Sequence, residues 1–249
     1  MSSLLYKVHA VESVKSTNTA LKALAKDGAP EGYVLVSASQ TNGRGRLNRV
    51  FFSPKGTGLY VSILLRPSCL LAPYALTCMT AAALAETVED YHVSCGIKWV
   101  NDIYVNEKKA AGILTESHLN QDGSFDYAVV GVGVNLFEPE DGFPANLHEK
   151  ATAVFSGAPD EEFRKQFLKR FLTRFKRYYD QLPQIAFFES YRDRMIGSGQ
   201  RVLVSEPDGI RYGTAVGIDR TFRLLVRFED GSENALDRGE IEFITNERV

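Results

Sequence analysis

The sequence predicts an α+β protein with a large domain over residues 1–196, in which helices flank a mixed sheet, and a small β-barrel domain over residues 197–249. Three observations predict this class. The 249 residues are 44% hydrophobic and 24% charged, as in soluble globular chains. Long helical patterns lie between short β runs in the first part of the chain. After Ile196-Gly197-Ser198-Gly199 the chain changes to short β runs, separated by turns rich in Asp and Gly.

The first elements are a helix, a strand and a long loop. A helix is expected over Thr17–Lys26, because Ser16 is a natural N-cap and Gly28 follows its end. A β run follows at Tyr33–Ala38. Residues Ser39–Gly58 contain four Gly, two Asn, one Pro and four cations, which indicates a connection rather than an element. Loops of that length inside a compact domain are usually functional.

The middle of the chain predicts a sheet beside a buried helix. Strands are expected at Leu59–Arg66, Gly96–Val100, Ile103–Asn106, Ala110–Glu116 and Tyr127–Asn135. The third and fourth form a hairpin with residues 106–109 at its tip, and the last, largely Val and Gly, is expected to be central. A helix is expected over Tyr74–Tyr91, entered through Pro73. The uncharged stretch Cys69–Ala85 falls short of the ~20 residues of a membrane span, so this helix is expected to be buried.

The last third contains one long helix and the C-terminal β runs. Apolar residues recur at helical spacing through Asp160–Leu182, with acids at its start and bases in its latter part, as the helix dipole favours. The β runs are Arg201–Ser205, Tyr212–Ile218, Leu224–Phe228 and Glu240–Ile244.

Charge is unevenly distributed along the chain. The formal net charge is -2, yet the 54 residues between Glu31 and Glu86 contain no Asp or Glu. The same window carries five cations, namely Arg44, Arg46, Arg49, Lys55 and Arg66. Buried strands and an apolar helix explain the missing acids but not the clustered arginines. An anionic partner held at one loop is the alternative that explains both.

Cysteine and histidine usage excludes several classes. The three cysteines form no CxxC and the four histidines are scattered, so neither a disulfide framework nor a protein-built zinc site is indicated. The N-terminus lacks a basic region followed by an apolar one, so no secretory signal is expected and the protein is expected to be cytoplasmic. The chain has no P-loop, no GxGxxG between strand and helix, no GxSxG and no HExxH. Gly131-Val132-Gly133 alone is a weak signal.

The loop after residue 39 is the best candidate site. Gly43-Arg44-Gly45-Arg46 alternates flexible backbone with guanidinium groups, which can turn towards phosphate or carboxylate oxygens. A solvated basic loop and an RNA-binding tract are the alternatives. Phe51 and Phe52 follow, and paired phenylalanines in a loop are expected to fold onto the core or a flat ring.

Two lysines are further candidates. Lys98-Trp99-Val100-Asn101-Asp102 places a cation, an amide and a carboxylate at the end of a β run, where alternation would put Lys98 and Val100 on one face and Trp99 on the other. A plain Asn-Asp turn beside a solvated lysine is the alternative. Lys109 could fold inward over a pocket or protect the hairpin edge.

Taken together, these segments resemble the catalytic domain of biotin protein ligases, from about Val11 to the C-terminus. The resemblance is carried by the order of Ser16-Thr17-Asn18, Gln40, Gly43-Arg44-Gly45-Arg46, Phe52-Ser53-Pro54, Gly58-Leu59-Tyr60, Lys98-Trp99-Val100-Asn101-Asp102, Lys109-Ala110-Ala111-Gly112-Ile113-Leu114 and Gly131-Val132-Gly133-Val134-Asn135. It implies a class II synthetase-like catalytic domain with an SH3-like C-terminal barrel.

The resemblance also implies a two-step reaction. The biotin carboxylate attacks the α-phosphate of ATP to give biotinyl-5′-AMP and pyrophosphate, with Mg²⁺ as cofactor, and a lysine of a biotin carboxyl carrier protein then takes the biotinyl group. Both substrates are anions, so an acid-free cationic loop lowers their repulsion. No nucleophilic side chain is needed.

Site residues follow from the matching positions. Biotin contacts are implied for Ser16, Thr17, Asn18, Gln40, Arg44, Gly45, Arg46, Lys109 and Gly112. ATP or adenylate contacts are implied for Arg44, Arg46, Arg49, Phe51, Lys55, Asn101, Asp102 and Asn135. Catalytic roles are implied for Lys109, Arg44, Arg46 and Lys98, and Asp102 is the implied Mg²⁺ ligand.

Three departures from the family pattern are visible. Asn48 replaces a frequent glycine after GRGR and is expected to supply the permissive backbone there. Phe51 stands where many members have Trp, and Val100 replaces the usual Pro of the KWPND segment.

The resemblance bears on partners as well. Only about 15 residues precede Ser16, which is too few for the winged helix-turn-helix of bifunctional members, so the monofunctional form without DNA binding is expected. No membrane partner is expected, and a homodimer through sheet edges is left open.

Two other functions compete with this one. A lipoate or octanoate ligase or transferase would share the fold, but its RRxxGGG-type loop and His-Asp pair are absent. A nucleic-acid-binding module would suit the GR loop, but residues 200–249 carry seven Arg against ten acids.

Overall fold

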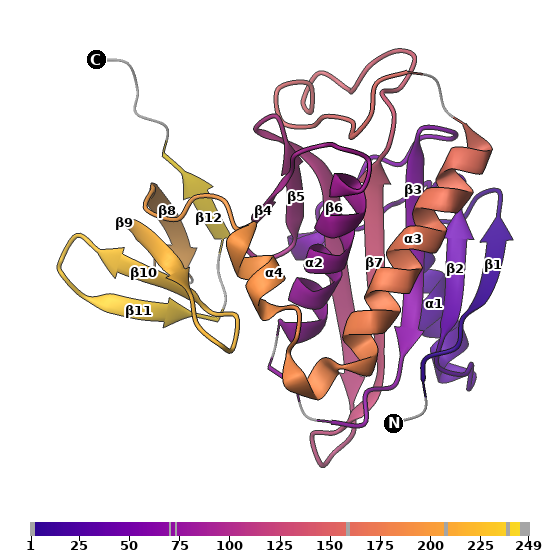
Figure 1. The fold of residues 1–249 in the computed structure, drawn as a ribbon, viewed down its shortest axis with the longest axis horizontal. Coiled ribbons are helices and arrows are strands. Elements are labelled where there is room, and N and C mark those ends of the chain that lie inside the picture. Colours follow the sequence, from indigo (N-terminus) through magenta and orange to yellow (C-terminus); the bar gives the residue numbers. More distant parts are fainter. Residues whose placement is uncertain are drawn as a thin grey trace.

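The strands of the protein form two sheets. The computed structural model describes residues 3–69, 71–72, 74–157, 160–206, 209–237 and 240–244. A seven-stranded sheet has the order β1-β2-β3-β7-β6-β5-β4, and a five-stranded sheet has the order β11-β10-β9-β8-β12 (Figure 1). Of the described strand pairs, β1 with β2 is parallel and the others are antiparallel. The predicted α+β class, with a mixed sheet and a small C-terminal β unit, is confirmed.

The bounds of the elements follow the chain in two groups. The first group is β1 (Lys7–Val11), α1 (Thr17–Lys26), β2 (Tyr33–Ser37), β3 (Gly58–Leu65), α2 (Ala75–Glu89), β4 (Gly96–Lys98), β5 (Asp102–Val105), β6 (Lys108–Leu119) and β7 (Phe125–Asn135). The second group is α3 (Glu161–Asp180), α4 (Phe188–Asp193), β8 (Arg201–Glu206), β9 (Gly209–Ile218), β10 (Leu224–Phe228), β11 (Glu233–Leu236) and β12 (Glu240–Phe243). Short 3₁₀ turns lie at Arg46–Asn48 and Leu182–Gln184.

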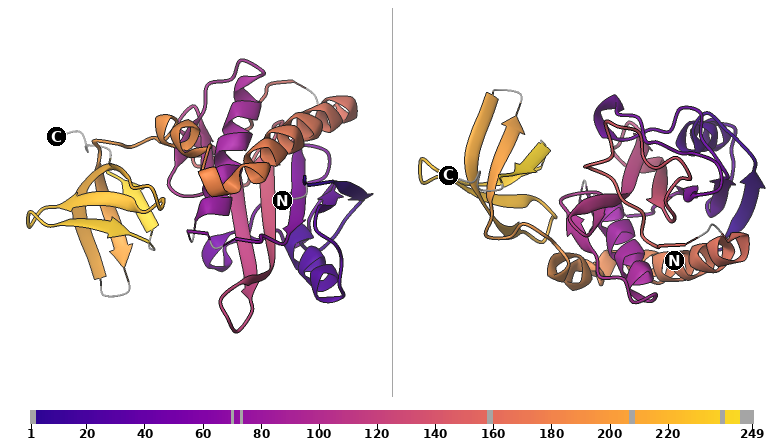
Figure 2. Two further views of the ribbon diagram at one scale, coloured as in Figure 1. Left: turned by 60° about the horizontal axis from the view of Figure 1, so that its bottom comes forward. Right: turned by 90° about the horizontal axis from the view of Figure 1, so that it is seen from above.

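The large sheet has helices on both faces. Helices α2 and α3 cover one face and α1 lies against the other (Figures 1 and 2). Side chains alternate along each strand, so Val61 and Ile63 of β3 join the main core while Leu64 packs under α1. On β7, Val130 and Val132 join the same core, and Gly131 and Gly133 face the α1 side. Beyond α1, this second face is therefore open for a site.

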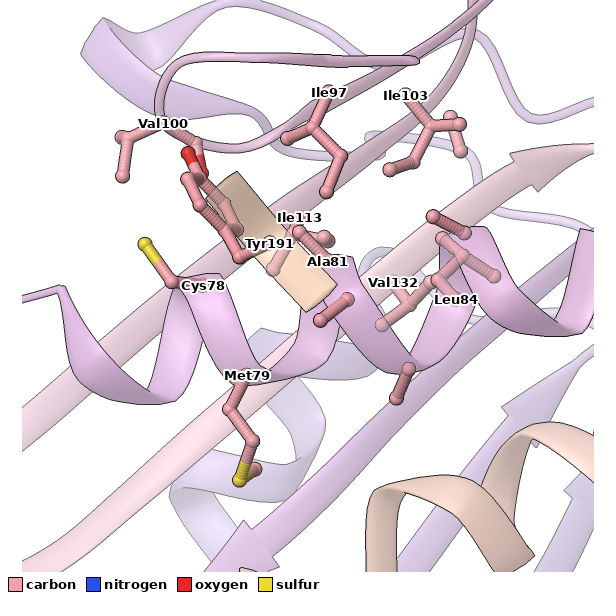
Figure 3. Packing of buried hydrophobic residues seen from close by; sticks show 14 of the residues in the cluster. Cys78, Met79, Ala81, Leu84, Ile97, Val100, Ile103, Ile113, Val132 and Tyr191 are labelled. Atoms are coloured by element: carbon pink, nitrogen blue, oxygen red, sulfur yellow. The ribbon is translucent and has the colours of Figure 1, made fainter. Parts of the chain in front are cut away.

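Helix α2 is buried along almost its whole length. It packs between the sheet and helices α3 and α4, and its alanines allow close approach on every side (Figure 3). The uncharged stretch thus forms a core helix, as expected. The predicted entry at Pro73 lies outside the described residues. In the described part of the chain, no helix is long and apolar enough to span a bilayer.

The exposed end of α2 is tied to α3 and α4 through Glu86. Its carboxylate accepts hydrogen bonds from Arg174 and Arg177 at 2.9 Å each, from Ser190 at 2.7 Å and from the Tyr178 hydroxyl. Burial raises the pKa of this carboxyl, but these donors together hold the pKa below its usual value. Glu86 therefore stabilises the packing of three helices in its ionised form.

Replacing Glu86 with Gln is expected to lower the free energy of unfolding at pH 7 by about 1–3 kcal/mol, because charge-assisted hydrogen bonds are lost. Since the folded-state pKa is depressed, the stabilisation is complete above the unfolded pKa and is lost as the pH falls through the folded one. Urea unfolding between pH 3 and 7 measures this. A variant whose stability falls with acid as steeply as that of the wild type would contradict the assignment.

The C-terminal sheet packs against helix α4 and the turn after β4 through aromatic side chains. Phe222, in the turn between β9 and β10, stacks on Phe187 with ring centroids 5.2 Å apart and also contacts Phe188 and Tyr191 of α4. Its carbonyl accepts a hydrogen bond from Trp99 Nε1 at 2.9 Å. Residues of both sheets belong to one continuous core. The domain boundary at residues 196 and 197 remains a prediction.

Three elements were not expected from the sequence. Strand β1 has mostly exposed side chains and lacks a two-residue alternation, and β11 is short and largely exposed. Helix α4 has only six residues. Strands β6 and β7 also extend further towards their shared turn than predicted. The strand expected over Gly96–Val100 ends at Lys98.

Candidate active site

A cleft of about 890 Å³ opens on the α1 side of the large sheet. Residues from α1, the long loop, strands β4 to β7, the segment after β7 and strand β12 line it. Predicted site residues that line it are Ser16, Thr17, Asn18, Gln40, Arg44, Gly45, Arg46, Arg49, Phe51, Lys98, Asn101, Asp102, Lys109, Gly112 and Asn135. The fold thus brings together segments that are more than 100 residues apart in the sequence.

The floor of the cleft consists of three glycines that each accommodate a protein side chain. A Cβ at Gly131 would lie 2.1 Å from Asn18 Oδ1, and one at Gly133 would lie 2.6 Å from the Phe51 ring. A Cβ at Gly112 would lie 3.2 Å from Lys109 Nζ. These glycines therefore position the residues that line the cleft. The Phe51 ring folds onto the sheet, as paired phenylalanines in a loop suggested.

Lys109 reaches the cleft because strand β6 contains a bulge. Tyr104 pairs with Lys109 and Ile103 pairs with Ala111, so Ala110 is the extra residue. Residues three apart in a regular strand face opposite sides, but the bulge places Lys109 on the same side as Gly112. Its Nζ lies 2.7 Å from Asp102 Oδ1. Lys109 therefore folds inward over the cleft, and the alternative, a lysine that protects the hairpin edge, is wrong.

A chain of buried hydroxyl and amide groups forms one wall. Ser62 Oγ lies 2.8 Å from Thr17 Oγ1, and the Thr17 backbone N–H donates to Gln40 Oε1 at 2.9 Å. Gln40 Nε2 then donates to Ser53 Oγ at 3.0 Å. Ser16 caps α1 next to them. The wall offers oriented polar groups suited to an uncharged polar ring.

The long loop folds over the cleft in a defined conformation. Gly45 N–H donates to the Arg49 carbonyl at 2.8 Å and Phe51 N–H donates to the Gly43 carbonyl at 2.9 Å. Asn48 has φ 59°, so the expectation that it supplies the permissive backbone of the loop is confirmed. Leu47, with φ 51°, has left-handed backbone as well. Arg46 Nη1 donates to Asn101 Oδ1 at 3.1 Å. The loop therefore closes against the β4–β5 turn.

The segment from Lys98 to Asp102 divides its side chains between core and cleft. The Lys98 ammonium lies over the rings of Tyr104 and Phe243, at 5.7 Å and 5.1 Å from their centroids. Trp99 and Val100 are both buried, so the expected alternation of Lys98 and Val100 against Trp99 is wrong. The reason is that β4 ends at Lys98 and a turn follows.

Two cations of the acid-free window, the predicted site residue Lys55 and Arg66, lie elsewhere. Lys55 does not line the cleft; its side chain is 73% exposed and pairs with Glu12 at 2.9 Å. Arg66 binds the carbonyls of Ala25, Ala29 and Asp126 at the far end of α1. Three of the five cations in the acid-free window, Arg44, Arg46 and Arg49, therefore contribute to the cleft.

Several cleft residues were not identified from the sequence. They come from the segment after β7 and from β12, and include Phe143, Asn146, Leu147, Glu149, Lys150, Ile241 and Glu242. Backbone bonds of Lys109 to Lys150 and Thr152, at 2.9 and 3.0 Å, fix the former segment. Asn135 Nδ2 donates to the Thr152 carbonyl at 3.1 Å. No local motif marks these residues, because only tertiary contacts bring them to the cleft.

Glu116 was also missed, although a signal for it exists. Gly112, Leu114 and Glu116 alternate along β6, so all three face the cleft side. Its carboxylate lies 3.1 Å from Arg44 Nη1 and 2.5 Å from Lys22 Nζ. Burial raises the pKa of Glu116, but Lys22, Asn18 and Arg44 together hold it below the usual value. It is ionised at neutral pH.

Fold and site together define an α+β enzyme in which a cationic loop closes over a cleft in a mixed sheet. The sequence profile of the biotin/lipoate A/B protein ligase family matches residues 10–135, and that of the biotin protein ligase C-terminal domain matches residues 197–244. The chain belongs to the biotin/lipoate A/B protein ligase family.

Individual relatives support the same family assignment. The bifunctional ligase/repressor BirA of Bacillus spizizenii is 34% identical over 226 residues, covering 88% of this chain and 68% of that protein. The biotin–[acetyl-CoA-carboxylase] ligase of Mycobacterium tuberculosis is 29% identical over 228 residues, covering 87% and 81%. The biotin protein ligase of Aquifex aeolicus, solved in complex with biotin and ATP, superposes with a TM-score of 0.80 at 27% identity, covering 96% and 99%.

Proposed function

We propose that this protein is a biotin protein ligase that activates biotin as biotinyl-5′-AMP and transfers biotin to a lysine of a carrier protein. The observation that carries this proposal is the arrangement of Lys109 and the arginine loop around one cleft that also contains the polar Thr17–Gln40 wall. A cationic end and a neutral polar end suit a ligand with a carboxylate at one end and a ureido ring at the other.

In the first step a biotin carboxylate oxygen forms a bond to the α-phosphorus of ATP, and the bond from that phosphorus to the bridging oxygen of pyrophosphate breaks. The cleft brings two anions together, so its first task is to offset their repulsion. Lys109, Arg46 and Arg49 are proposed to stabilise the negative charge on the phosphoryl oxygens as it builds up. Phe51 is proposed to contact the adenine ring.

In the second step the neutral amine of the acceptor lysine attacks the biotinyl carbonyl carbon and an amide bond forms. The bond from that carbon to the phosphate oxygen breaks, AMP leaves, and the amine gives one proton to water. No protein nucleophile takes part. The loop that carries Arg44 and Arg46 is proposed to exclude water from the adenylate between the steps. The acceptor is proposed to be a biotin carboxyl carrier protein.

Asp102 is the proposed ligand for Mg²⁺. One oxygen, Oδ1, is buried and lies 2.7 Å from the Lys109 ammonium, so the carboxylate is held at the cleft. Magnesium sites in such enzymes commonly use one or two carboxylates together with substrate phosphates, and Asp102 fits that pattern. When bound, the ion would neutralise phosphate charge. Lys98 and Asn101 are proposed to orient the same phosphates.

Three free cysteines support a cytoplasmic location, because the structure contains Cys69, Cys78 and Cys95 as unbridged thiols. The monofunctional form and the homodimer remain predictions. A lipoate or octanoate ligase is the alternative function that the test must separate.

The test is exchange of labelled pyrophosphate into ATP by the purified protein with biotin, lipoate or octanoate as the acid. Biotin alone is expected to support exchange, because the Thr17–Gln40 wall presents polar groups to a ureido ring. Exchange with lipoate and none with biotin would overturn the proposed function.

Replacing Arg46 with Gly is expected to release biotinyl-5′-AMP from the closed site. The variant loses the hydrogen bond to Asn101, so the loop opens more often while the Thr17–Gln40 wall is unchanged. Biotin on unrelated lysines of a bystander protein measures the escape, with an increase of about tenfold or more expected. Equal bystander labelling by variant and wild type would contradict this role for the loop.

A further inference from the structure

Glu116 is the residue at which three parts of the site meet. Its side chain is 20% exposed and comes from β6. Oε1 lies 2.5 Å from Lys22 Nζ and accepts a hydrogen bond from Arg44 Nη1 at 3.1 Å, while Oε2 accepts one from Asn18 Nδ2 at 3.0 Å. Helix α1 and the arginine loop are thereby both attached to one carboxylate on the sheet.

The contact between Glu116 and Asn18 fixes the position of the Asn18 side chain in the cleft wall. Its Nδ2 donates to both the Leu114 carbonyl and Glu116, and its Oδ1 accepts from Ser62 Oγ at 2.6 Å. Both amide hydrogens are therefore used. The same Oδ1 occupies the space where Gly131 lacks a Cβ. Asn18 is 3% exposed, so its amide cannot change partners without disturbing the wall.

The two arginines of the GRGR segment have different partners. Arg44 faces the ionised Glu116, whereas Arg46 donates to the amide oxygen of Asn101. The Glu116 carboxylate offsets the charge of Arg44 and holds its guanidinium by an ion pair. Arg44 therefore holds the loop to β6 through an ion pair, while the Arg46–Asn101 hydrogen bond holds it to the β4–β5 turn.

We propose that Glu116 is a positioning residue of the ligase site, which fixes Arg44 of the loop and Asn18 of the biotin wall relative to each other. This inference rests on the proposed ligase function. Glu116 acts through these two side chains and does not need to touch a substrate.

Limited proteolysis tests the contact without any substrate. Trypsin cleaves after Arg44, Arg46 and Arg49, which all lie in the loop, so its rate there measures how often the loop opens. Glu116→Gln keeps the shape of the side chain but removes the charge, and is expected to speed loop cleavage by about tenfold. Lys22→Met is the matched control, because Lys22 also pairs with Glu116 but does not line the cleft. It is expected to leave loop cleavage near the wild-type rate.

Pyrophosphate exchange kinetics of the Glu116 variants test whether the Glu116–Arg44 contact affects catalysis. In pyrophosphate exchange, Glu116→Gln is expected to raise the KM for biotin by about tenfold and to increase labelling of bystander lysines, with a smaller change in kcat. Glu116→Asp, which restores the charge, is expected to recover part of the loss. Combined with Arg44→Gln, Glu116→Gln is expected to add little further loop opening, because the two residues act as a pair.

Each outcome bears on one proposal. An inactive wild type would contradict the proposed ligase function and leave the proteolysis result valid. An active wild type with unchanged loop cleavage and unchanged biotin KM in Glu116→Gln would overturn the positioning role. Fully additive effects of Glu116→Gln and Arg44→Gln on loop cleavage would overturn it as well. Thermal unfolding of each variant establishes that it is folded.

Discussion

Replacing Lys109 with Ala is expected to lower the rate of biotin-dependent pyrophosphate exchange by about 10²–10³-fold, because one preorganised cation is lost where negative charge builds up. The bulge at Ala110 directs this side chain into the cleft, and its ammonium lies beside Asp102. The variant also leaves the Asp102 carboxylate without its ion-pair partner in a site that must receive two anions. Both effects act in the same direction.

Lys108→Ala is the matched control for that variant. Lys108 is the neighbouring residue, but its ammonium donates to the His148 carbonyl and does not line the cleft. It is expected to retain exchange within about twofold of the wild type, since exposed pairs contribute little. Wild-type exchange by Lys109→Ala, or an equal loss in both variants, would contradict the role of Lys109.

Replacing Phe222 with Ala is expected to lower the free energy of unfolding by about 3–5 kcal/mol, the usual cost of removing a fully buried phenylalanine. The ring is 0% exposed and packs against Phe187, Phe188 and Tyr191. The cavity would open between the C-terminal sheet and helix α4. Urea denaturation monitored by circular dichroism measures the loss.

Tyr212→Ala, in the same C-terminal sheet, is the comparison for Phe222→Ala, because the Tyr212 side chain is exposed. It is expected to change stability by no more than about 0.5 kcal/mol. If both variants lose the same stability, the Phe222 packing does not connect the two sheets in the way described.

Much of the fold followed from local patterns. Helix α1 begins at Thr17 after its Ser16 cap, and α2 is the buried helix that an uncharged stretch of limited length predicted. The elements that were not predicted are those that tertiary contacts define and that show no regular pattern of apolar residues. The side chains of β1 are mostly exposed, so its sequence shows no strand pattern. The segment is recognised as a strand only because it pairs in parallel with β2. The six residues of α4 are too few to show a helical period.

More of the candidate site than of the strand order could be predicted from the sequence. Its residues lie in short motifs with special backbone or charge, such as Gly43-Arg44-Gly45-Arg46, and such motifs are visible without a structure. Lys109 could not be decided, because one extra residue in β6 determines which face it occupies. The β12 residues gained their place only from contacts across the fold, whereas alternation along β6 places Glu116 on the cleft side but does not reveal its partners. Three cations of the acid-free window pair with acids from outside it: Arg44 with Glu116 of β6, Lys55 with Glu12 and Arg66 with Asp126.

The sole tryptophan makes the junction between the two sheets observable in solution. Trp99 is 4% exposed, and its indole N–H is bound to the carbonyl of Phe222 in the C-terminal sheet. Indole emission depends on the polarity around the ring, so the fluorescence of the unmodified protein reports on the surroundings of Trp99, which include this contact and the Tyr74 ring. Separation of the C-terminal sheet would shift the emission to longer wavelength before the large sheet unfolds. Opening of this junction can therefore be timed against catalysis without attaching a dye.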